Sequence, residues 1–249
     1  PFVGVVTSWN EASPGNIALA RQAQAVKRGV RDAGGTPREF TTIGGSDSGV
    51  SGISSLISRD LIADSIEAMV RAHGYVALVG LAGCGTSLAA MMMAMARLDL
   101  PSVIMFGGAA LPGRYLDRDI TLQDVYEAVG AHAAGTISDD DLRAIETAAC
   151  PSAGAGAGQF SANTMASVSE VIGLAVPGSA GLPAPYDARD DFAHKAGLTV
   201  MDLLDRDIRP RDILTGQAFE NAASIVAASG GATCACLLYT SDAADDVRG

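Results

Sequence analysis

Residues 75–108 read YVALVGLAGCGTSLAAMMMAMARLDLPSVIMFGG, and this stretch decides the fold. Two short apolar runs, residues 75–81 and 101–108, enclose a longer Met-rich segment at 87–98. The short runs have the length and composition of buried strands, whereas the segment between them is long enough for a helix. A strand, a helix and a second strand in this order form a βαβ unit, which makes the two strands parallel neighbours in one sheet.

The chain on both sides of this unit repeats the alternation. Further strands are expected at residues 1–8 and 36–43. Helices are expected at 16–33, at 58–73 with Ser58 as N-cap, and at 122–148, 163–172, about 187–204 and 218–228. The sequence therefore predicts an α/β fold in three layers, a parallel sheet flanked by helices. Ligands bind at the carboxyl ends of the strands in such sheets.

Composition narrows the class of protein. The chain has 249 residues, of which 48% are hydrophobic and 18% charged, and its formal net charge is -11. An acidic chain without a basic cluster argues against nucleic acid and anionic membrane as partners. The apolar stretches are broken by Gly and polar residues, unlike membrane spans. With no signal peptide in sight, we expect a cytoplasmic protein whose native start lies upstream of Pro1.

Several candidate site residues have more than one interpretation. The small-residue loop 153–158 is either a tight connection or a backbone cradle for an anion or cofactor. Asp47 is either a ligand of a hard cation or a turn residue, and Cys84 is either a ligand or a small core side chain. The four cysteines are expected as thiols or ligands rather than disulfides, and no histidine has the setting of a ligand. The cysteines are Cys84, Cys150, Cys234 and Cys236.

The loops taken together resemble one family, the dihydroxy-acid dehydratases and the related sugar-acid dehydratases. The resemblance extends from residue 1 to about 235 and rests on several blocks in the same order. They include SWNEASPGN (8–16), SRDLIADSIEAMVRAHGY (58–75), GLAGCGTS (80–87), ACPSAGAGAGQFSANTMASVSEVIGLAVPGSAGLPAP (149–185) and RPRDILTGQAFENA (209–222).

The resemblance implies a hydro-lyase that converts a 2,3-dihydroxy acid to a 2-keto acid and water. The reaction belongs to branched-chain amino-acid biosynthesis or to sugar-acid catabolism. The family also implies Mg²⁺, an iron–sulfur cluster as Lewis acid, and a homodimer when the protein is full length. The catalytic serine of the family lies in a C-terminal half that this chain does not contain, so no catalytic residue is assigned here. The alternative is a non-catalytic paralogue without a cluster that keeps the fold and the oligomer interface.

On this resemblance, three positions of the chain correspond to the cysteines that hold the cluster. Cys84 retains the ligand, whereas Gly15 and Gly156 occupy the other two positions. One thiolate is too few for a conventional cluster. Cysteines placed at both glycines are expected to restore some cluster binding.

The metal site departs from the family as well. Asp47 matches the metal-binding aspartate, but Gly85 and Thr86 stand where the family has an Asp and a modified Lys. One magnesium ligand is retained where several are expected.

The C-terminal tail differs from the rest. Residues 236–249, CLLYTSDAADDVRG, look like the in-frame translation of a transposon-based sequencing adapter. We therefore expect the dehydratase N-terminal domain to occupy residues 1–235, with an adapter-derived artefact at 236–249. Residues 239–249 are expected to pack against nothing specific, because they lack an apolar period.

Overall fold

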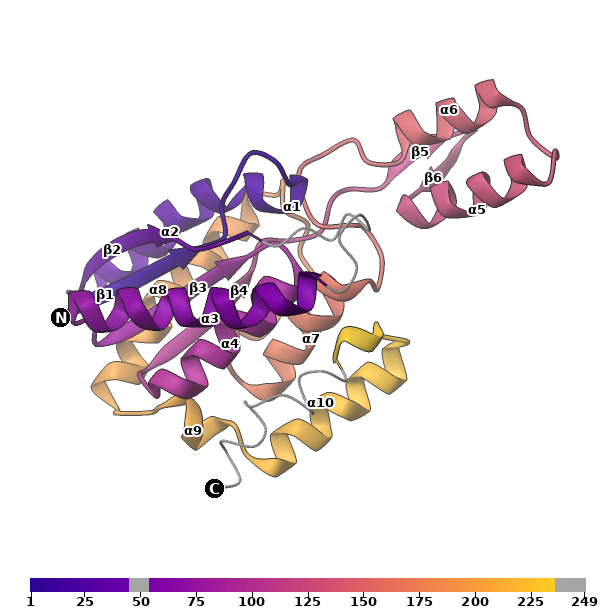
Figure 1. Ribbon diagram of the computed structural model, residues 1–249. Coiled ribbons are helices and arrows are strands. Elements are labelled where there is room, and N and C mark those ends of the chain that lie inside the picture. The colour runs from indigo at the N-terminus through magenta and orange to yellow at the C-terminus, as the bar shows by residue number, and fades with distance from the viewer. Residues whose placement is uncertain (45–53, 236–249) are drawn as a thin grey trace.

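Four parallel strands form the sheet at the centre of the protein (Figure 1). The computed structural model describes residues 1–44 and 54–235, except for the side chains of 54–57 and 234. The strands lie in the order β2-β1-β3-β4. Their bounds are Phe2–Thr7 for β1, Thr36–Thr41 for β2, Ala77–Ala82 for β3 and Ser102–Phe106 for β4. Every residue of β3 and β4 is buried, which is why both read as unbroken apolar runs in the sequence.

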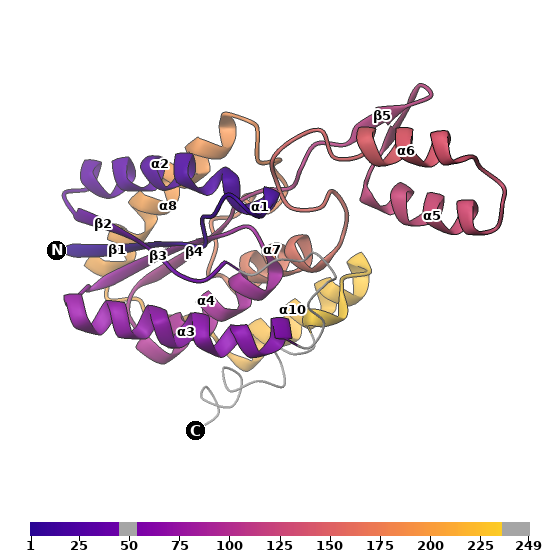
Figure 2. The same ribbon diagram turned by 45° about the horizontal axis from the view of Figure 1, so that its top comes forward.

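Helices cover both faces of the sheet, so the predicted α/β architecture is confirmed (Figure 2). Two helices, α2 (Leu19–Asp32) and α8 (Ala188–Asp205), pack on one face. Four helices lie on the other face of the sheet and share a second apolar core. These helices are α3 (Ser54–His73), α4 (Gly85–Leu98), α7 (Ser161–Ile172) and α10 (Gly216–Ser229).

The Met-rich helix α4 is the most deeply buried helix of that layer. All its residues from Leu88 to Ala96 are buried. It packs between the sheet, α3 and α7, which leaves no side for solvent. A helix that is apolar all round is expected in such a position. Its last turn carries Arg97, whose guanidinium reaches Asp60, Asp64 and Glu67 of α3 at 3.2–3.4 Å.

Two expectations about helix bounds were wrong. Ser58 is not an N-cap, because α3 already begins at Ser54 and Ser58 lies inside it. Several serines precede the apolar pattern, and composition does not choose among them. The expected helix over 122–148 is two helices, α5 (Leu122–Ala133) and α6 (Asp139–Ala148). A new N-terminus is stabilised by the Ser138 capping box with Asp141, so the chain turns between them.

A small lobe projects from the sheet body (Figure 1). It consists of α5, α6 and an antiparallel hairpin that the sequence did not predict, β5 (Gly113–Tyr115) with β6 (Arg118–Ile120). The hairpin turns through Leu116 and Asp117, both with positive φ. The lobe has an apolar core of its own around Ile120 and Ile145. Short helices α1 (Pro14–Ile17) and α9 (Pro210–Ile213) and a 3-10 turn, η1 (Thr233–Ala235), complete the described chain.

Candidate functional site

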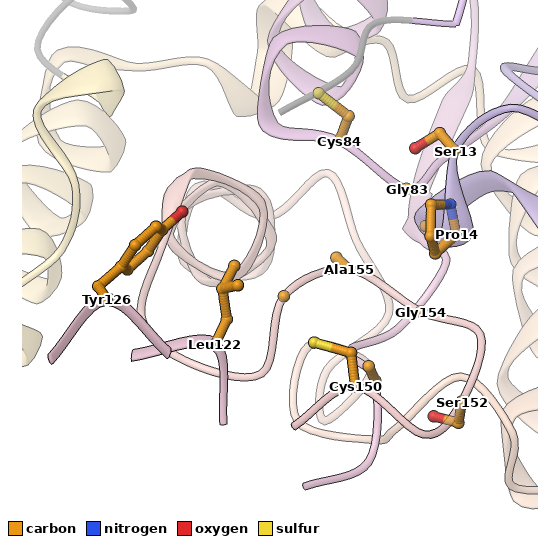
Figure 3. A pocket seen from close by; sticks show the side chains of 13 residues that line it. Ser13, Pro14, Gly83, Cys84, Leu122, Tyr126, Cys150, Ser152, Gly154 and Ala155 are labelled. Atoms are coloured by element: carbon orange, nitrogen blue, oxygen red, sulfur yellow. The ribbon is translucent and has the colours of Figure 1, made fainter. Parts of the chain in front are cut away.

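A pocket of about 340 Å³ opens at the carboxyl ends of the strands (Figure 3). The segment after β1 contributes Gly15, the turn after β3 contributes Gly83 and Cys84, and the segment after β4 contributes Ala110. The small-residue loop contributes Gly156. The structure thus brings the three positions singled out for the cluster, 15, 84 and 156, to one pocket. Parallel strands end at the same edge, which explains how distant loops meet here.

Backbone hydrogen bonds hold the small-residue loop against the sheet. The Gly154 amide donates to the Pro14 carbonyl at 2.9 Å, and the Ala155 amide donates to the Gly108 carbonyl at 2.9 Å. The Ala155 carbonyl accepts from the Ala110 amide at 2.6 Å. The amides of 154 and 155 are therefore committed to protein carbonyls. At these two residues the loop is an extension of the sheet rather than an anion cradle.

Cys84 is the N-cap of α4 and is 2% exposed, so its thiol lies in the core at the edge of the pocket. Cys150 is exposed and lines the same pocket. In Figure 3 the two side chains lie on opposite sides of the backbone at Ala155, and the Cys84 sulfur points away from Cys150. The two thiols therefore do not face each other across the cavity.

Glycine at position 15 is required by packing. A Cβ at Gly15 would lie 2.6 Å from the carbonyl oxygen of Gly83, closer than real Cβ atoms approach backbone. A Cβ at Gly83 would in turn overlap the carbonyl oxygen of Gly15. The turns after β1 and β3 thus touch backbone to backbone, and a side chain at either residue requires them to separate.

Position 85 is closed in the same way. A Cβ at Gly85 would lie 2.7 Å from the backbone carbonyl of Ser161, at the start of α7. Position 156 is different, because the nearest neighbours of a Cβ there would be the Phe160 ring at 3.3 Å and Leu122 at 3.6 Å. These neighbours are side chains and can move. Thr86, at the other altered metal position, is half-buried.

The residues present do not fit the cluster that the family implies. Among the described residues, no group of three or more His, Cys, Asp or Glu side chains is placed to share a metal ion. Asp47, the candidate magnesium ligand, lies outside the described residues, as do the Cys234 side chain and Cys236. Asp47 therefore stays a prediction.

Two of the three histidines contact a carboxylate on the surface, away from the pocket. His132 contacts Asp139 at 2.5 Å, and His194 contacts Asp32 at 2.8 Å. His73 lies in the last turn of α3. None of the three lines the pocket.

Sequence reasoning missed the part that the lobe plays in the pocket. Leu122 and Tyr126 of α5 line its outer side. Their spacing of four residues places them on one helix face, which was a usable signal. The Tyr126 ring meets the Phe160 ring edge to face, with 6.4 Å between the centroids and 86° between the planes. The pocket therefore lies between the sheet body and the lobe.

Buried polar side chains form hydrogen bonds to the segments that lead into the pocket wall. The Ser8 hydroxyl donates to Asn16 Oδ1 at 3.0 Å, and Gln22 donates to the Gly107 carbonyl at 2.7 Å. Arg189 is fully buried and donates to the carbonyls of Phe106 and Ser179. Burial lowers the pKa of this guanidinium to about 10. These bonds fix the end of β4 and the loop after α7, on which the pocket wall rests.

Residues 1–244 match a family model with the description "Dihydroxy-acid/6-phosphogluconate dehydratase N-terminal". This match ends nine residues beyond 235, the residue at which the dehydratase domain was expected to end. The domain boundary at 235 stays a prediction. Dihydroxy-acid dehydratases of Pelagibacter ubique and Parvibaculum lavamentivorans are each 62% identical, over 241 and 237 residues. The dihydroxy-acid dehydratase of Sulfurisphaera tokodaii is 50% identical over 241 residues.

These alignments cover 94–95% of this chain and 41–43% of the relatives. The chain thus spans about two fifths of the length of the relatives it matches. With the parallel sheet and the sequence blocks at its carboxyl edge, the chain belongs to the dihydroxy-acid and 6-phosphogluconate dehydratase family and represents its N-terminal domain.

Proposed function

We propose that the longer protein to which this chain belongs is a hydro-lyase of the dihydroxy-acid dehydratase type. The observation that carries this proposal is the 62% identity, over 95% of the chain, to a relative with that name. In the reaction a base removes the proton at C2, the C3–O bond breaks, and the departing hydroxide takes up a proton, so that the hydrogen of C2 and the hydroxyl of C3 are lost in sum as one water. The enol that remains tautomerises to the 2-keto acid. The family implies Mg²⁺ and an iron–sulfur cluster for this chemistry.

The contribution of this chain is the pocket at the strand ends. Its volume of about 340 Å³ suits a small organic acid. Its wall is mostly backbone and apolar surface, and the residues with hydroxyl groups among its lining are Ser13, Tyr126 and Ser152. The proposed role of the chain is to enclose the substrate, while the base lies in the C-terminal half.

Among the described residues, none of the helices combines the length and the apolar character that a membrane span needs.

The test is an assay of the full-length protein from the uninterrupted gene. Purified without oxygen and supplied with Mg²⁺, it should form a 2-keto acid from a branched-chain 2,3-dihydroxy acid faster than from a sugar acid. The reverse preference would assign it to sugar-acid catabolism. No turnover of either substrate, from folded protein, would contradict the proposal. Gel filtration of the same sample tests the proposed homodimer.

A second candidate function is that of a non-catalytic paralogue. The observation that favours it is the combined change at 15, 85, 86 and 156, which removes ligands of both inorganic groups on the family alignment. Such a protein would keep the fold and the oligomer interface. Iron and acid-labile sulfide analysis of the full-length protein distinguishes the two candidates, because a stoichiometric cluster contradicts the paralogue.

A further inference from the structure

We propose that the backbone of this chain closes its pocket to an iron–sulfur cluster, so that the domain reaches the same folded state with or without iron. The proposal concerns this chain alone and does not rest on the proposed function. It goes beyond the missing cysteines, because it states that two of the altered positions cannot accept a ligand side chain. Four features of the pocket support it.

The first feature is the number and placement of the thiols. Among the described residues, Cys84 and Cys150 are the cysteines that line the pocket. They lie on opposite sides of the Ala155 backbone. Thiolate ligands of one cluster must converge on the same small volume, because each binds an iron of the same unit. This pair does not converge.

The second feature is the contact between the turns after β1 and β3. Gly15 and Gly83 each lie where a Cβ would meet the carbonyl oxygen of the other. Carbonyl oxygens of buried turns cannot rotate away as side chains do, so a cysteine at 15 forces one turn off the other. A substitution of Gly15 by cysteine therefore cannot supply a cluster ligand while the two turns stay in contact.

The third feature is the lack of room for a side chain at Gly85, together with a backbone hydrogen bond that joins the loops around the pocket. The main chain of Ser161 lies within 2.7 Å of a Cβ at Gly85. The Pro14 carbonyl, next to Gly15, accepts the Gly154 amide at 2.9 Å. This hydrogen bond joins the turn after β1 to the small-residue loop without any metal. The pocket is thus fixed by main-chain contacts that do not need a cofactor.

The fourth feature is the contrast at Gly156, which serves as an internal control. The atoms nearest to its Cβ would belong to side chains, at 3.3 Å or more, and its φ is not in the positive region. A cysteine at 156 therefore fits after a small shift of Phe160. The two glycines that appear equivalent on the family alignment differ in the room that surrounds them.

The experiment starts with the unaltered chain. After anaerobic incubation with ferrous iron and sulfide and removal of the excess, iron and sulfide should be far below one per chain. Visible absorption bands should be absent, and the melting temperature should match that of the untreated protein. Stoichiometric iron and sulfide that disappear in Cys84→Ser would overturn the proposal.

Three variants test the cause. Gly15→Cys and the sulfur-free control Gly15→Ser should both lower the melting temperature, by roughly 2–12 °C for an overpacked site in a domain of this size. Gly156→Cys should change it little. Cysteines at both 15 and 156 were expected from the family alignment to restore some cluster binding, whereas the closed contact at Gly15 argues against it. The proposal is wrong if Gly15→Cys melts like Gly156→Cys. It is also wrong if the double variant Gly15→Cys/Gly156→Cys takes up a cluster and keeps the melting temperature of the unaltered chain. The iron and sulfide analysis of the unaltered chain needs no variant at 15 or 156, so it stays decisive if one of these variants misfolds.

Discussion

Gly29 of α2 and Gly197 of α8 lie at the point where the two helices touch. A Cβ at Gly29 would overlap the carbonyl oxygen of His194, and a Cβ at Gly197 would overlap that of Val26. The two helices therefore pack main chain against main chain on the sheet. The hydrogen bond between His194 Nε2 and Asp32, at 2.8 Å, lies beside this contact.

Alanine at Gly197 should therefore destabilise the protein. The methyl group has no room between the helices, so we expect a loss of about 1–3 kcal/mol in the free energy of unfolding. Urea denaturation measures it. Gly130→Ala is the matched control, because this helical glycine of α5 has open space around its Cβ position. The control should gain about 0.5–1 kcal/mol from helix propensity. Equal effects of the two changes would contradict the close crossing.

Arg189→Met should destabilise the protein although it removes a buried charge. Two buried carbonyls, of Phe106 and Ser179, lose their donor, at about 1–3 kcal/mol each. Loss of the desolvated cation offsets part of this, so we expect a net loss of about 2 kcal/mol. Arg206→Met is the control, since Arg206 pairs only on the surface with Asp202 at 3.2 Å. If Arg189→Met is neutral in urea denaturation, desolvation of the guanidinium outweighs its hydrogen bonds.

The two pocket cysteines should differ in reactivity. Cys150 is exposed, whereas Cys84 is 2% exposed and reacts only when the structure opens. A neutral maleimide should therefore label Cys84 at least about tenfold more slowly, a difference that urea abolishes. Peptide mass spectrometry assigns the label to each thiol, and Cys84→Ser identifies the slow peptide. Similar rates in the folded protein would contradict the burial of Cys84.

The lobe should lose its helix caps in acid. Hydrogen bonds from Ser138, first its hydroxyl and then its amide, lower the pKa of Asp141 below 3.8. The Thr121 amide has the largest effect in lowering the pKa of Asp124. A folded-state pKa below the unfolded value gives stability that is complete above pH 3.8 and is lost as pH falls through the folded value.

Amide exchange should accordingly accelerate in α5 and α6 below pH 3.8, relative to the intrinsic exchange rates. Asp141→Asn should remove most of this dependence in α6. Asp140→Asn, in the same helical turn but outside the capping box, should leave it in place. Acceleration in the sheet before the lobe would contradict the prediction.

The sheet and its helices could be predicted because their patterns are long and periodic. The hairpin could not, because β5 and β6 have three residues each and the turn uses Leu116 and Asp117 in place of the usual glycine or asparagine. The end of one helix and the start of α6 could have been predicted, since Ser138 and Asp141 have the spacing of a capping box. The break between the two helices was overlooked because the helical period continues on both sides of it.

The candidate site was predictable in part. The order of the loops placed 15, 84 and 156 at one edge of the sheet, and the structure brings them to one pocket. The sequence treats Gly15 and Gly156 alike, because the room around a glycine depends on the main chain of distant segments. For Gly15 that segment is the turn at Gly83, which no local pattern reveals.

One feature of the pocket wall bears on how the protein folds. Ala109 pairs on one edge with Ala155 and on the other with Pro183, so three segments distant in the sequence form a short layer beyond β4. Closing such long loops costs entropy before their contacts are made, whereas α5, α6 and the hairpin form from neighbouring residues. The wall should therefore assemble late in refolding. Intermediates trapped before that step would contain the sheet and still lack a binding pocket.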